Sequence, residues 1–280
     1  MQYGISMFPT DYTITPADLA IAMEARGFES FWAPEHSHIP VSRKSPWPGG
    51  PELPKPYYDV MDPFVVLAVM SAVTKKMKLG TGICLVVQRD PIQTAKEICT
   101  LDTLSGGRFL FGVGAGWNAE EIADHGVKFE DRMEVMRERI DAIKIICSKS
   151  KPEYHSKHVN FDPFMSWPKT VQKPHPPVIV GGGFPHGARR AAEYGDGWMP
   201  IAGRDDIMSN ISKFRQLVAE GGRDPDKVGI SVFGVAPDAE KIKPFIDAGV
   251  ERVVFSLPAE DAAANIPRLD KMAEVMQKVK

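Results

Sequence analysis

One pattern recurs along this chain. It consists of apolar residues at helical spacing, followed by a glycine and then by a short apolar run. In Pro16 to Arg26 the apolar residues follow helical spacing, Gly27 fits the position after a helix C-terminus, and the apolar run Ser30 to Ala33 follows. The same order returns around Gly195 and Gly249. Each occurrence is typical of a helix that ends at a glycine and leads into a buried strand.

Short β-rich runs of this kind bring the number of expected strands to eight, at residues 3–8, 30–33, 79–87, 108–113, 178–180, 198–199, 230–234 and 252–256. Helical patterns separate most of them, at residues 16–26, 63–74, 91–104, 131–147, 206–219, 238–248 and from 262 onward. Eight strands alternating with helices favour an α/β protein, a (β/α)8 TIM barrel, over an open sheet. We expect one domain covering residues 1–280.

Two long segments interrupt this alternation. Residues 40–58, after the second expected strand, contain six prolines, and residues 151–177, after the fourth, are rich in His, Trp and Pro. Loops of this length are commonly functional lids or disordered. Their aromatic residues, such as Trp47 and Tyr57, favour ordered insertions that cover a site.

Composition narrows the function classes. The formal net charge is −2 and there is no run rich in Lys or Arg, so we expect no nucleic-acid partner. Neither a signal peptide nor an apolar run of about 18 residues is found, which predicts a soluble cytoplasmic protein without a membrane partner. The three cysteines, Cys84, Cys99 and Cys147, are interpreted as small buried apolar residues.

The second strand runs directly into Glu35-His36-Ser37-His38. Barrel enzymes keep their chemistry at the C-terminal ends of strands, and imidazole is the side chain best able to exchange a proton near neutral pH. Glu35 points to the opposite side of an extended chain from His36, so it is expected to orient a neighbour or support the barrel. The His-x-His pattern also occurs in metal-dependent hydrolases, but Ser256 ends the last strand where an acid is needed, so we expect no metal.

Glycines gather at the ends of the fourth and fifth strands, in Gly112 to Asn118 and in Gly181 to Gly183. Glycine lets backbone N–H groups approach a phosphate closely, although either motif alone is equally compatible with a tight turn. Two such loops on neighbouring strands favour a phosphate-bearing cofactor. A further glycine, Gly82, lies inside the third strand and indicates a bulge or a close ligand approach.

An ordered set of motifs resembles the bacterial-luciferase-like flavin and deazaflavin oxidoreductases over nearly the whole chain. The set is Trp32-Ala33-Pro34-Glu35-His36, Leu79-Gly80-Thr81-Gly82-Ile83, Arg89-Asp90-Pro91, Leu104-Ser105-Gly106-Gly107-Arg108-Phe109, Phe111-Gly112-Val113-Gly114-Ala115-Gly116-Trp117 and Tyr194-Gly195-Asp196-Gly197-Trp198. The short chain and the Ser-Gly-Gly-Arg run are most similar to the branch that uses the deazaflavin coenzyme F420.

The resemblance implies a barrel with a tricyclic cofactor across its C-terminal mouth and hydride transfer at the central ring. It assigns Glu35 and His36 to the catalytic face, with His36 also against the cofactor, and it places a bulge, often with a non-prolyl cis bond, at Gly82-Ile83. The remaining cofactor-binding positions that it implies are Ala115, Gly116, Trp117, Asn118, Gly181, Gly182 and Gly183. It also implies a homodimer, to which the apolar positions Phe64, Val65, Leu67, Ala68 and Met70 contribute.

The resulting hypothesis is an oxidoreductase that transfers a hydride between coenzyme F420 and a small organic substrate. An FMN-dependent monooxygenase of the same fold is the nearest alternative, because FMN-binding and deazaflavin-binding members share much of this motif set. A non-catalytic flavin- or deazaflavin-binding protein is the alternative from another class. A metal-dependent hydrolase is the most distant one.

Overall fold

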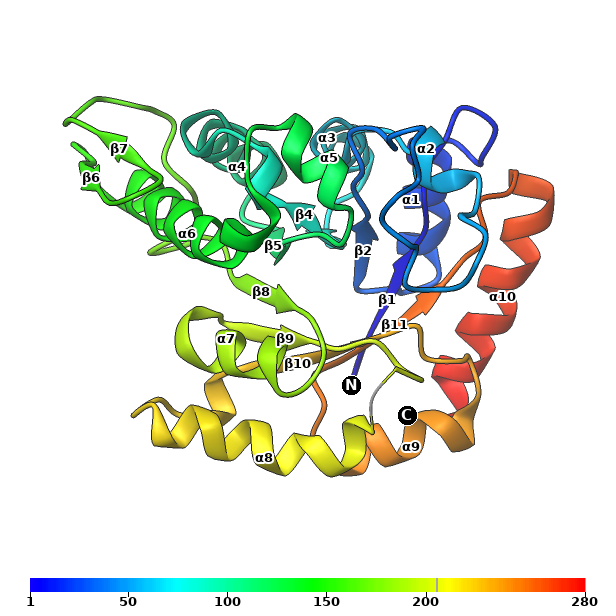
Figure 1. Ribbon diagram of the computed structural model, residues 1–280. Helices are drawn as coiled ribbons and strands as arrows, with labels where there is room; N and C mark the ends of the chain where they lie inside the picture. Colours follow the sequence, from blue (N-terminus) through cyan, green and yellow to red (C-terminus); the bar gives the residue numbers. More distant parts are fainter. Residues whose placement is uncertain (205, 280) are drawn as a thin grey trace.

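Parallel strands form a closed barrel in the computed structural model, which describes residues 1–204 and 206–279 (Figure 1). The strands of the barrel are β1 (Gln2–Ser6), β2 (Ser30–Ala33), β3 (Lys78–Thr81), β4 (Cys84–Leu85), β5 (Phe109–Gly114), β8 (Val178–Gly181), β9 (Gly197–Met199), β10 (Gly229–Phe233) and β11 (Arg252–Ser256). Their spatial order is β3-β2-β1-β11-β10-β9-β8-β5-β4, and an additional pairing of β3 with β5 closes the ring.

The register shows how the two ends of the chain meet. Gln2 of β1 lies opposite Arg252 of β11, and Leu79 of β3 lies opposite Phe109 of β5. Strands β3 and β4 follow one another along a single position of the barrel and are separated by Gly82 and Ile83. The barrel therefore has eight strand positions, all parallel, which confirms the predicted (β/α)8 class.

The principal helices are α1 (Pro16–Ala25), α3 (Pro63–Val73), α4 (Pro91–Ser105), α6 (Arg132–Ser148), α7 (His186–Tyr194), α8 (Ile207–Glu220), α9 (Ala239–Asp247) and α10 (Ala262–Lys278). Local sequence sets their ends. Asp90 accepts a hydrogen bond from the Gln93 amide at the start of α4, ahead of a first-turn proline, and Gly106 ends the helix in the left-handed conformation. These are the side-chain and glycine caps that the sequence pattern predicts.

Two apolar layers hold the barrel together. The larger one lies between the strands and the helices, whereas Trp32, Leu110, Ile179, Met199 and Val254, from five different strands, form a separate cluster inside the barrel. A side chain at Gly80 would place its Cβ 2.5 Å from the Trp32 ring. Glycine at this position thus makes room for the buried indole.

The structure differs from the expected pattern in the two insertions, in one strand and in one additional helix. The segment after β2 contains the short helix α2 (Pro56–Asp59), and the segment after β5 contains the hairpin β6 (Tyr154–His155) and β7 (Asn160–Phe161), which projects beside α6 (Figure 1). Residues 79–87, expected as one strand, are interrupted after Thr81 and end in the 3-10 helix η1 (Val86–Gln88). The helix α5 (Ala119–Asp124) follows β5 directly and was not expected.

Among residues 1–204 and 206–279, none of the helices is both long enough and apolar enough to cross a membrane.

Candidate active site

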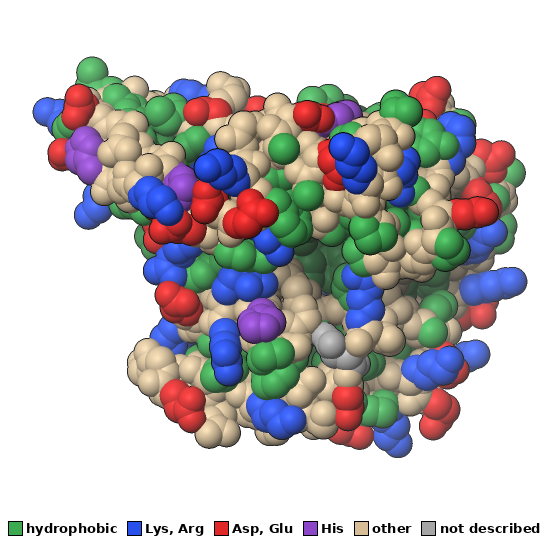
Figure 2. Space-filling model, viewed as in Figure 1, with side chains coloured by type: hydrophobic (Ala, Val, Ile, Leu, Met, Phe, Trp, Pro, Cys, Tyr) green, Lys and Arg blue, Asp and Glu red, His purple; other side chains and the backbone are tan. Residues whose placement is uncertain are grey.

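Two adjoining cavities lie at the C-terminal mouth of the barrel. One of about 190 Å³ reaches His36, and the other, of about 320 Å³, extends over the ends of β5 and β8. Their shared walls are Pro48, Gly82, Ile83, Gly116, Trp117, Ile201 and Arg204. Figure 2 shows the hollow on this face, with apolar side chains in its depth and Lys or Arg side chains around it. The mouth is thus apolar inside and basic at its rim.

The peptide bond between Gly82 and Ile83 is cis, as the sequence predicted, and it lies in the wall shared by both cavities. The Ile83 side chain projects across the ends of two neighbouring strands. A Cβ at Gly114 would lie 2.3 Å from Ile83 Cδ1, and one at Gly181 would lie 3.1 Å from Ile83 Cγ2. Both glycines therefore leave the space that the Ile83 side chain occupies.

His36 lies at the inner end of the smaller cavity, and its side chain is only 7% exposed. Its Nδ1 is 2.9 Å from Oε2 of Glu121, a carboxylate that is almost fully buried. The rings of Tyr57 and Trp117 pack around the imidazole at centroid distances of 5.3 and 5.8 Å. A carboxylate that accepts from Nδ1–H fixes the imidazole orientation and leaves Nε2 to take up or release a proton.

Glu121 is a candidate site residue that was not predicted from the sequence. It lies in α5, where the Asn118 side chain caps the helix by accepting from the Glu121 amide at 3.2 Å, and its second oxygen accepts from the Ser37 amide. Asn-x-x-Glu is a helix-start signature that normally assigns the acid a local capping role. The available signal was the final Glu of this motif, three residues after Asn118, but its contact with His36 spans 85 residues of sequence.

Glu35 faces away from His36 and joins the support of the bulge. One carboxylate oxygen accepts from the Leu85 amide at 2.5 Å, and the other pairs with Arg89 at 2.5 Å. Arg89 also binds Asp62 and Glu97, and the surrounding acids raise its pKa against the effect of burial. Both oxygens of Glu35 are engaged, so the structure ties this residue to the backbone that follows the cis bond.

The glycine loops expected to bind a cofactor are only partly brought together. Ala115, Gly116, Trp117, Gly181 and Gly182 line the larger cavity. Asn118 is instead buried as the cap of α5, and Gly183 accepts a hydrogen bond from the Gly187 amide at the start of α7. Neither of these two is part of the cavity wall.

Two arginines in or next to the wall of the larger cavity were not among the expected site residues. Arg190 lines the cavity, and Arg132 precedes Met133, which also lines it. The Nε atoms of both side chains are buried and have no hydrogen-bond partner among the described residues. Burial, and then the charge of Arg190, lower the pKa of Arg132. The sequence signal was the arginine pair that follows Gly181 to Gly183, although only the second arginine lines the cavity.

A third cavity, of about 410 Å³, shares Glu35 and His36 with the smaller one and includes Ser37, Gln88 and His125 in its wall. The Ser37 hydroxyl is 2.9 Å from His38 Nδ1 and 2.7 Å from His125 Nε2. Both amide atoms of Gln88 are buried without a partner in the described part of the chain. A buried amide of this kind is normally satisfied by water or a ligand.

The His-x-His motif does not assemble a metal site in the described residues. His38 Nε2 pairs with Asp124 at 2.9 Å, and His36 pairs with Glu121. A different group, Glu134, Glu138 and His158, could hold an ion within the described ranges, but it lies on α6 and in the turn of the β6–β7 hairpin. Glu138 in that group already accepts hydrogen bonds from the backbone amides of His158 and Val159.

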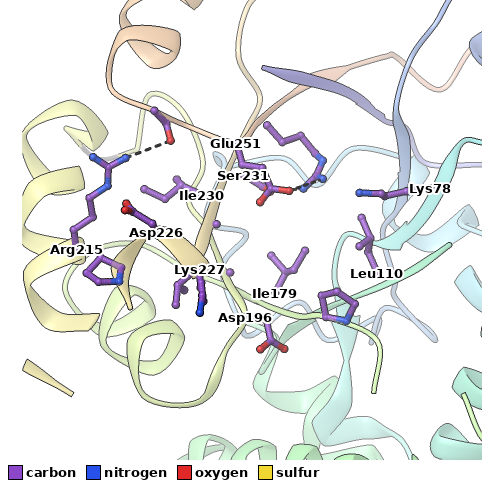
Figure 3. Close-up of a pocket in the computed structure, with 17 residues that line it drawn as sticks. Lys78, Leu110, Ile179, Asp196, Arg215, Asp226, Lys227, Ile230, Ser231 and Glu251 are labelled. Atoms are coloured by element: carbon purple, nitrogen blue, oxygen red, sulfur yellow. Dashed lines mark hydrogen bonds and ion pairs between the residues drawn. The ribbon is translucent and has the colours of Figure 1, made fainter. Parts of the chain in front are cut away.

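A cavity of about 360 Å³ lies at the opposite, N-terminal end of the barrel (Figure 3). Charged side chains line it, and three of its long basic side chains are bound to groups of the chain itself. Arg252 pairs with Glu29 at 2.8 Å and donates to Ser231, Lys78 pairs with Glu29 at 3.1 Å, and Arg215 donates to the Ala248 carbonyl. This arrangement is typical of a structural end of a barrel.

Comparisons with known proteins identify relatives of this chain and structures that share its fold. An uncharacterized protein of Mycobacterium tuberculosis is 40% identical over 278 residues, which cover 96% of this chain and 97% of that protein. Two solved structures share the fold over essentially all of both chains. They are the monooxygenase RslO1 from Streptomyces bottropensis (TM-score 0.80, 19% identity, 99% of each chain) and the coenzyme F420 dependent tetrahydromethanopterin reductase from Methanopyrus kandleri (TM-score 0.79, 20% identity, 100% and 99%).

The family model described as luciferase-like monooxygenase matches residues 15–241. This range includes the His36–Glu121 pair, the cis bond at Gly82-Ile83 and both glycine loops. The chain belongs to the luciferase-like monooxygenase family of oxidoreductases.

Proposed function

We propose that this protein transfers a hydride between coenzyme F420 and a small organic substrate. The observation that carries the proposal is the buried His36–Glu121 pair, because His36 lines the same cavity as the cis Gly82-Ile83 bulge. A proton-exchanging group beside a flat, apolar cradle is what hydride transfer to or from an oxygen-bearing carbon needs. The Methanopyrus kandleri reductase, whose fold this chain shares, is described as F420 dependent.

The residues of the mouth fit such a cofactor. The apolar bulge at Ile83 would lie against its ring, and Ala115, Gly116, Gly181 and Gly182 leave backbone close to the larger cavity. Arg190 would meet the phosphate, because its Nε is buried without a partner in the described ranges. Guanidinium groups and exposed backbone N–H groups are the usual phosphate ligands. Asn118 and Gly183 are left out of this assignment because they do not line the cavity.

His36 would be the catalytic acid or base. Its Nδ1 is held by Glu121, so Nε2 accepts the hydroxyl proton of an alcohol as it is oxidised, or donates a proton to a carbonyl oxygen as it is reduced. Bound coenzyme F420 would supply the hydride acceptor or donor for that reaction. Glu121 is a positioning residue, because its carboxylate touches His36 Nδ1 and holds the orientation of the imidazole. Glu35 supports the bulge through Leu85 and Arg89.

The substrate chamber would be the smaller cavity next to His36. Its lining is largely apolar and aromatic, with Phe8, Trp47, Tyr57 and Trp117 among its residues. Trp47 and Tyr57 come from the insertion after β2, and their rings pack against one another at 5.5 Å. This insertion would exclude water from the reacting atoms, and a volume of about 190 Å³ suits a small organic molecule.

Direct binding tests the proposal. Purified protein is titrated separately with oxidised coenzyme F420 and with FMN, and the change in cofactor fluorescence gives each dissociation constant. We expect F420 to bind at micromolar or lower concentration and at least about tenfold more tightly than FMN, a difference of about 1.4 kcal/mol. Tighter binding of FMN, or binding of neither cofactor, would overturn the proposal.

An FMN-dependent monooxygenase is the second candidate, because RslO1, whose fold this chain also shares, is described as a monooxygenase. Reduced FMN reacts readily with oxygen, whereas a reduced deazaflavin does so poorly. Oxygen consumption measured with each reduced cofactor therefore separates the two candidates. Uptake with reduced FMN, together with oxygenated product, would replace the first proposal by the second.

We also propose a homodimer that forms through α3 and α4. Of the apolar positions used in the sequence argument, Phe64, Leu67 and Met70 are buried in the core, whereas Val65 remains 65% exposed. Val65 lines a groove of about 530 Å³ together with Leu104, which is 66% exposed. Val65→Asp should shift the mass from dimer to monomer in light scattering, with Val41→Asp, at an exposed valine outside the groove, as the matched control. A monomeric parent protein at micromolar concentration would contradict the proposal.

A further inference from the structure

Two of the three cysteines form a buried pair that the proposed reaction does not use. Cys99 lies on α4 and Cys147 on α6, and their sulfur atoms are 3.5 Å apart in a thiol hydrogen bond. Their exposures are 3% and 0%, so both were correctly expected to be buried. Their mutual contact was not expected, because 48 residues separate them. The third thiol, Cys84, lies in β4 near Glu35.

The surroundings distinguish the two thiols. The hydrogen bond with Cys147 lowers the pKa of Cys99, burial opposes this effect, and the nearby Lys169 ammonium adds to the lowering. The same hydrogen bond and burial raise the pKa of Cys147. Lys169 belongs to the insertion after β5 and is held by the Ile146 carbonyl at 2.6 Å. Cys99 is therefore the more nucleophilic sulfur and Cys147 its proton-bearing neighbour.

We propose that Cys99 and Cys147 form a reversible disulfide when the protein meets a hydroperoxide. The Cys99 thiolate attacks one peroxide oxygen, the O–O bond breaks, and a sulfenic acid forms while hydroxide leaves and is protonated to water. The Cys147 thiol then attacks the Cys99 sulfur, the S–S bond forms, the S–O bond breaks, and a second water leaves with the Cys147 proton. The peroxide is reduced to two waters, or to an alcohol and water, and the two thiols are oxidised. A dithiol reductant restores them.

The position of the pair connects this oxidation to the wall of the mouth. Helix α4 follows η1, the segment that leads away from the cis bulge, and Arg139 of α6 donates to the carbonyls of Val86 and Val87 in η1. A bond between α4 and α6 thus links both elements that hold η1. Closing a loop of this length also restricts the unfolded chain, so the oxidised protein should melt at a temperature several degrees higher.

The test uses the intact protein without any cofactor. Protein is treated with hydrogen peroxide at a temperature where circular dichroism shows it to be folded, then denatured and alkylated with N-ethylmaleimide, and its mass is measured. We expect the number of alkylated thiols to fall from three to one, with a peptide cross-link between Cys99 and Cys147 that dithiothreitol reverses. Cys84→Ser is the matched control, since it should leave the cross-link unchanged.

Single-site variants separate the two steps. Cys147→Ser should stop the reaction at Cys99 and allow a dimedone adduct there, whereas Cys99→Ser should leave Cys147 unmodified. Three free thiols in the folded parent protein after treatment would overturn the proposal. Overoxidation of Cys99 while Cys147 stays free, or a cross-link that includes Cys84, would also overturn it. Because mapping of the parent protein decides the question, a variant that fails to fold does not prevent the test.

Discussion

A cavity lies at each end of the barrel, and the two ends differ in whether their buried arginines have partners. At the N-terminal end, Arg252 is 1% exposed and binds Glu29, Glu251 and Ser231, so the buried cation is matched within the chain. At the C-terminal mouth, the Nε of Arg190 is buried without a partner among the described residues. The buried arginine of one end is thus satisfied by folding alone, whereas the Nε of the arginine at the other end remains available.

The presence or absence of partners for buried polar groups distinguishes a structural cavity from a functional one better than the volume of the cavity does. The N-terminal cavity, at about 360 Å³, is larger than either cavity of the mouth that we assign to cofactor and substrate. Buried polar groups normally have partners, so an unpartnered one indicates water, an ion or a ligand that the chain does not supply. Substitutions at the N-terminal end should therefore affect unfolding, and substitutions at the mouth should affect binding and turnover.

The largest expected effect is that of Glu29→Gln on stability. This change leaves the buried Arg252 without its closest carboxylate, and breaking such a pair costs about 3 kcal/mol. Urea denaturation at pH 7 measures the loss, and affinity for the cofactor should stay at the parent value. An unchanged urea midpoint, or weakened cofactor binding in a folded variant, would contradict the division between the two ends.

The same pair predicts a pH dependence with a definite sign. Burial raises the pKa of Glu29, but the hydrogen bond and charge of Arg252 outweigh it, so the pKa lies below its ordinary value. Stability from a lowered carboxyl pKa is present above the pKa of the unfolded chain, about 4.3, and is lost as pH falls through the folded value. The difference between parent and Glu29→Gln should therefore be constant from about pH 6 to pH 8 and shrink below about pH 4.

Next in size is the effect of His36→Ala on turnover. Loss of a general acid or base costs on the order of 10²-fold in rate, while the cofactor cradle at Ile83 and Gly182 is untouched. Steady-state rates with coenzyme F420 and a panel of small alcohols and ketones measure the loss, and fluorescence titration checks that binding is retained. Turnover at the parent rate would remove His36 from the mechanism and leave His38 as the next imidazole to test.

Glu121→Gln complements that test, because Glu121 acts through His36. Without the carboxylate the imidazole loses the acceptor that orients it, so kcat should fall while the KM for the substrate stays near the parent value. A purely structural role would instead lower the stability of the fold and change KM together with kcat. Glu120→Gln is a suitable control, since the neighbouring Glu120 binds Ser45 instead of His36.

Arg190→Met tests the basic end of the mouth and should weaken cofactor binding about tenfold, or by about 1.4 kcal/mol. It retains most of the side-chain volume, so the fold should be kept. Gly182→Val is a poorer choice, because Gly182 has φ +127° and its Cβ would lie 3.3 Å from Gly187 Cα. Arg189→Met, at the exposed neighbour, is the matched control. If Arg190→Met and Arg189→Met bind the cofactor with equal affinity, the phosphate of the cofactor binds elsewhere.

Much of the fold follows from local sequence. Glycine stops such as Gly27 and Gly249, with the apolar runs after them, located the strands because both signals act within a few residues. The end of the strand at residues 79–87 was placed wrongly. Its apolar residues continue past Thr81, but the chain turns at the cis bond and enters η1, where Glu35 and Arg89 hold it.

The site was predictable only where a motif is continuous in sequence. His36 and the cis bond at Gly82-Ile83 lie inside such motifs, and both line the mouth. Glu121 was missed because a long-range contact pairs it with His36, and its local pattern is fully explained by helix capping. Gln88 was missed because a single polar residue after an apolar run gives no sign that its amide is buried without a partner.

The smallest expected effect compares one buried polar side chain from each end. Ser231 at the N-terminal end accepts a hydrogen bond from Arg252 at 2.8 Å, so Ser231→Ala should lower stability by about 1 kcal/mol. Gln88 at the mouth has no such bond in the described part of the chain, so Gln88→Leu should change stability by less than about 0.5 kcal/mol or raise it. Urea denaturation of the two variants side by side gives both values. If Gln88→Leu proves the more destabilising, the Gln88 amide of the parent protein is hydrogen-bonded to structural water. Gln88 would then be a satisfied structural group, like Ser231 at the other end.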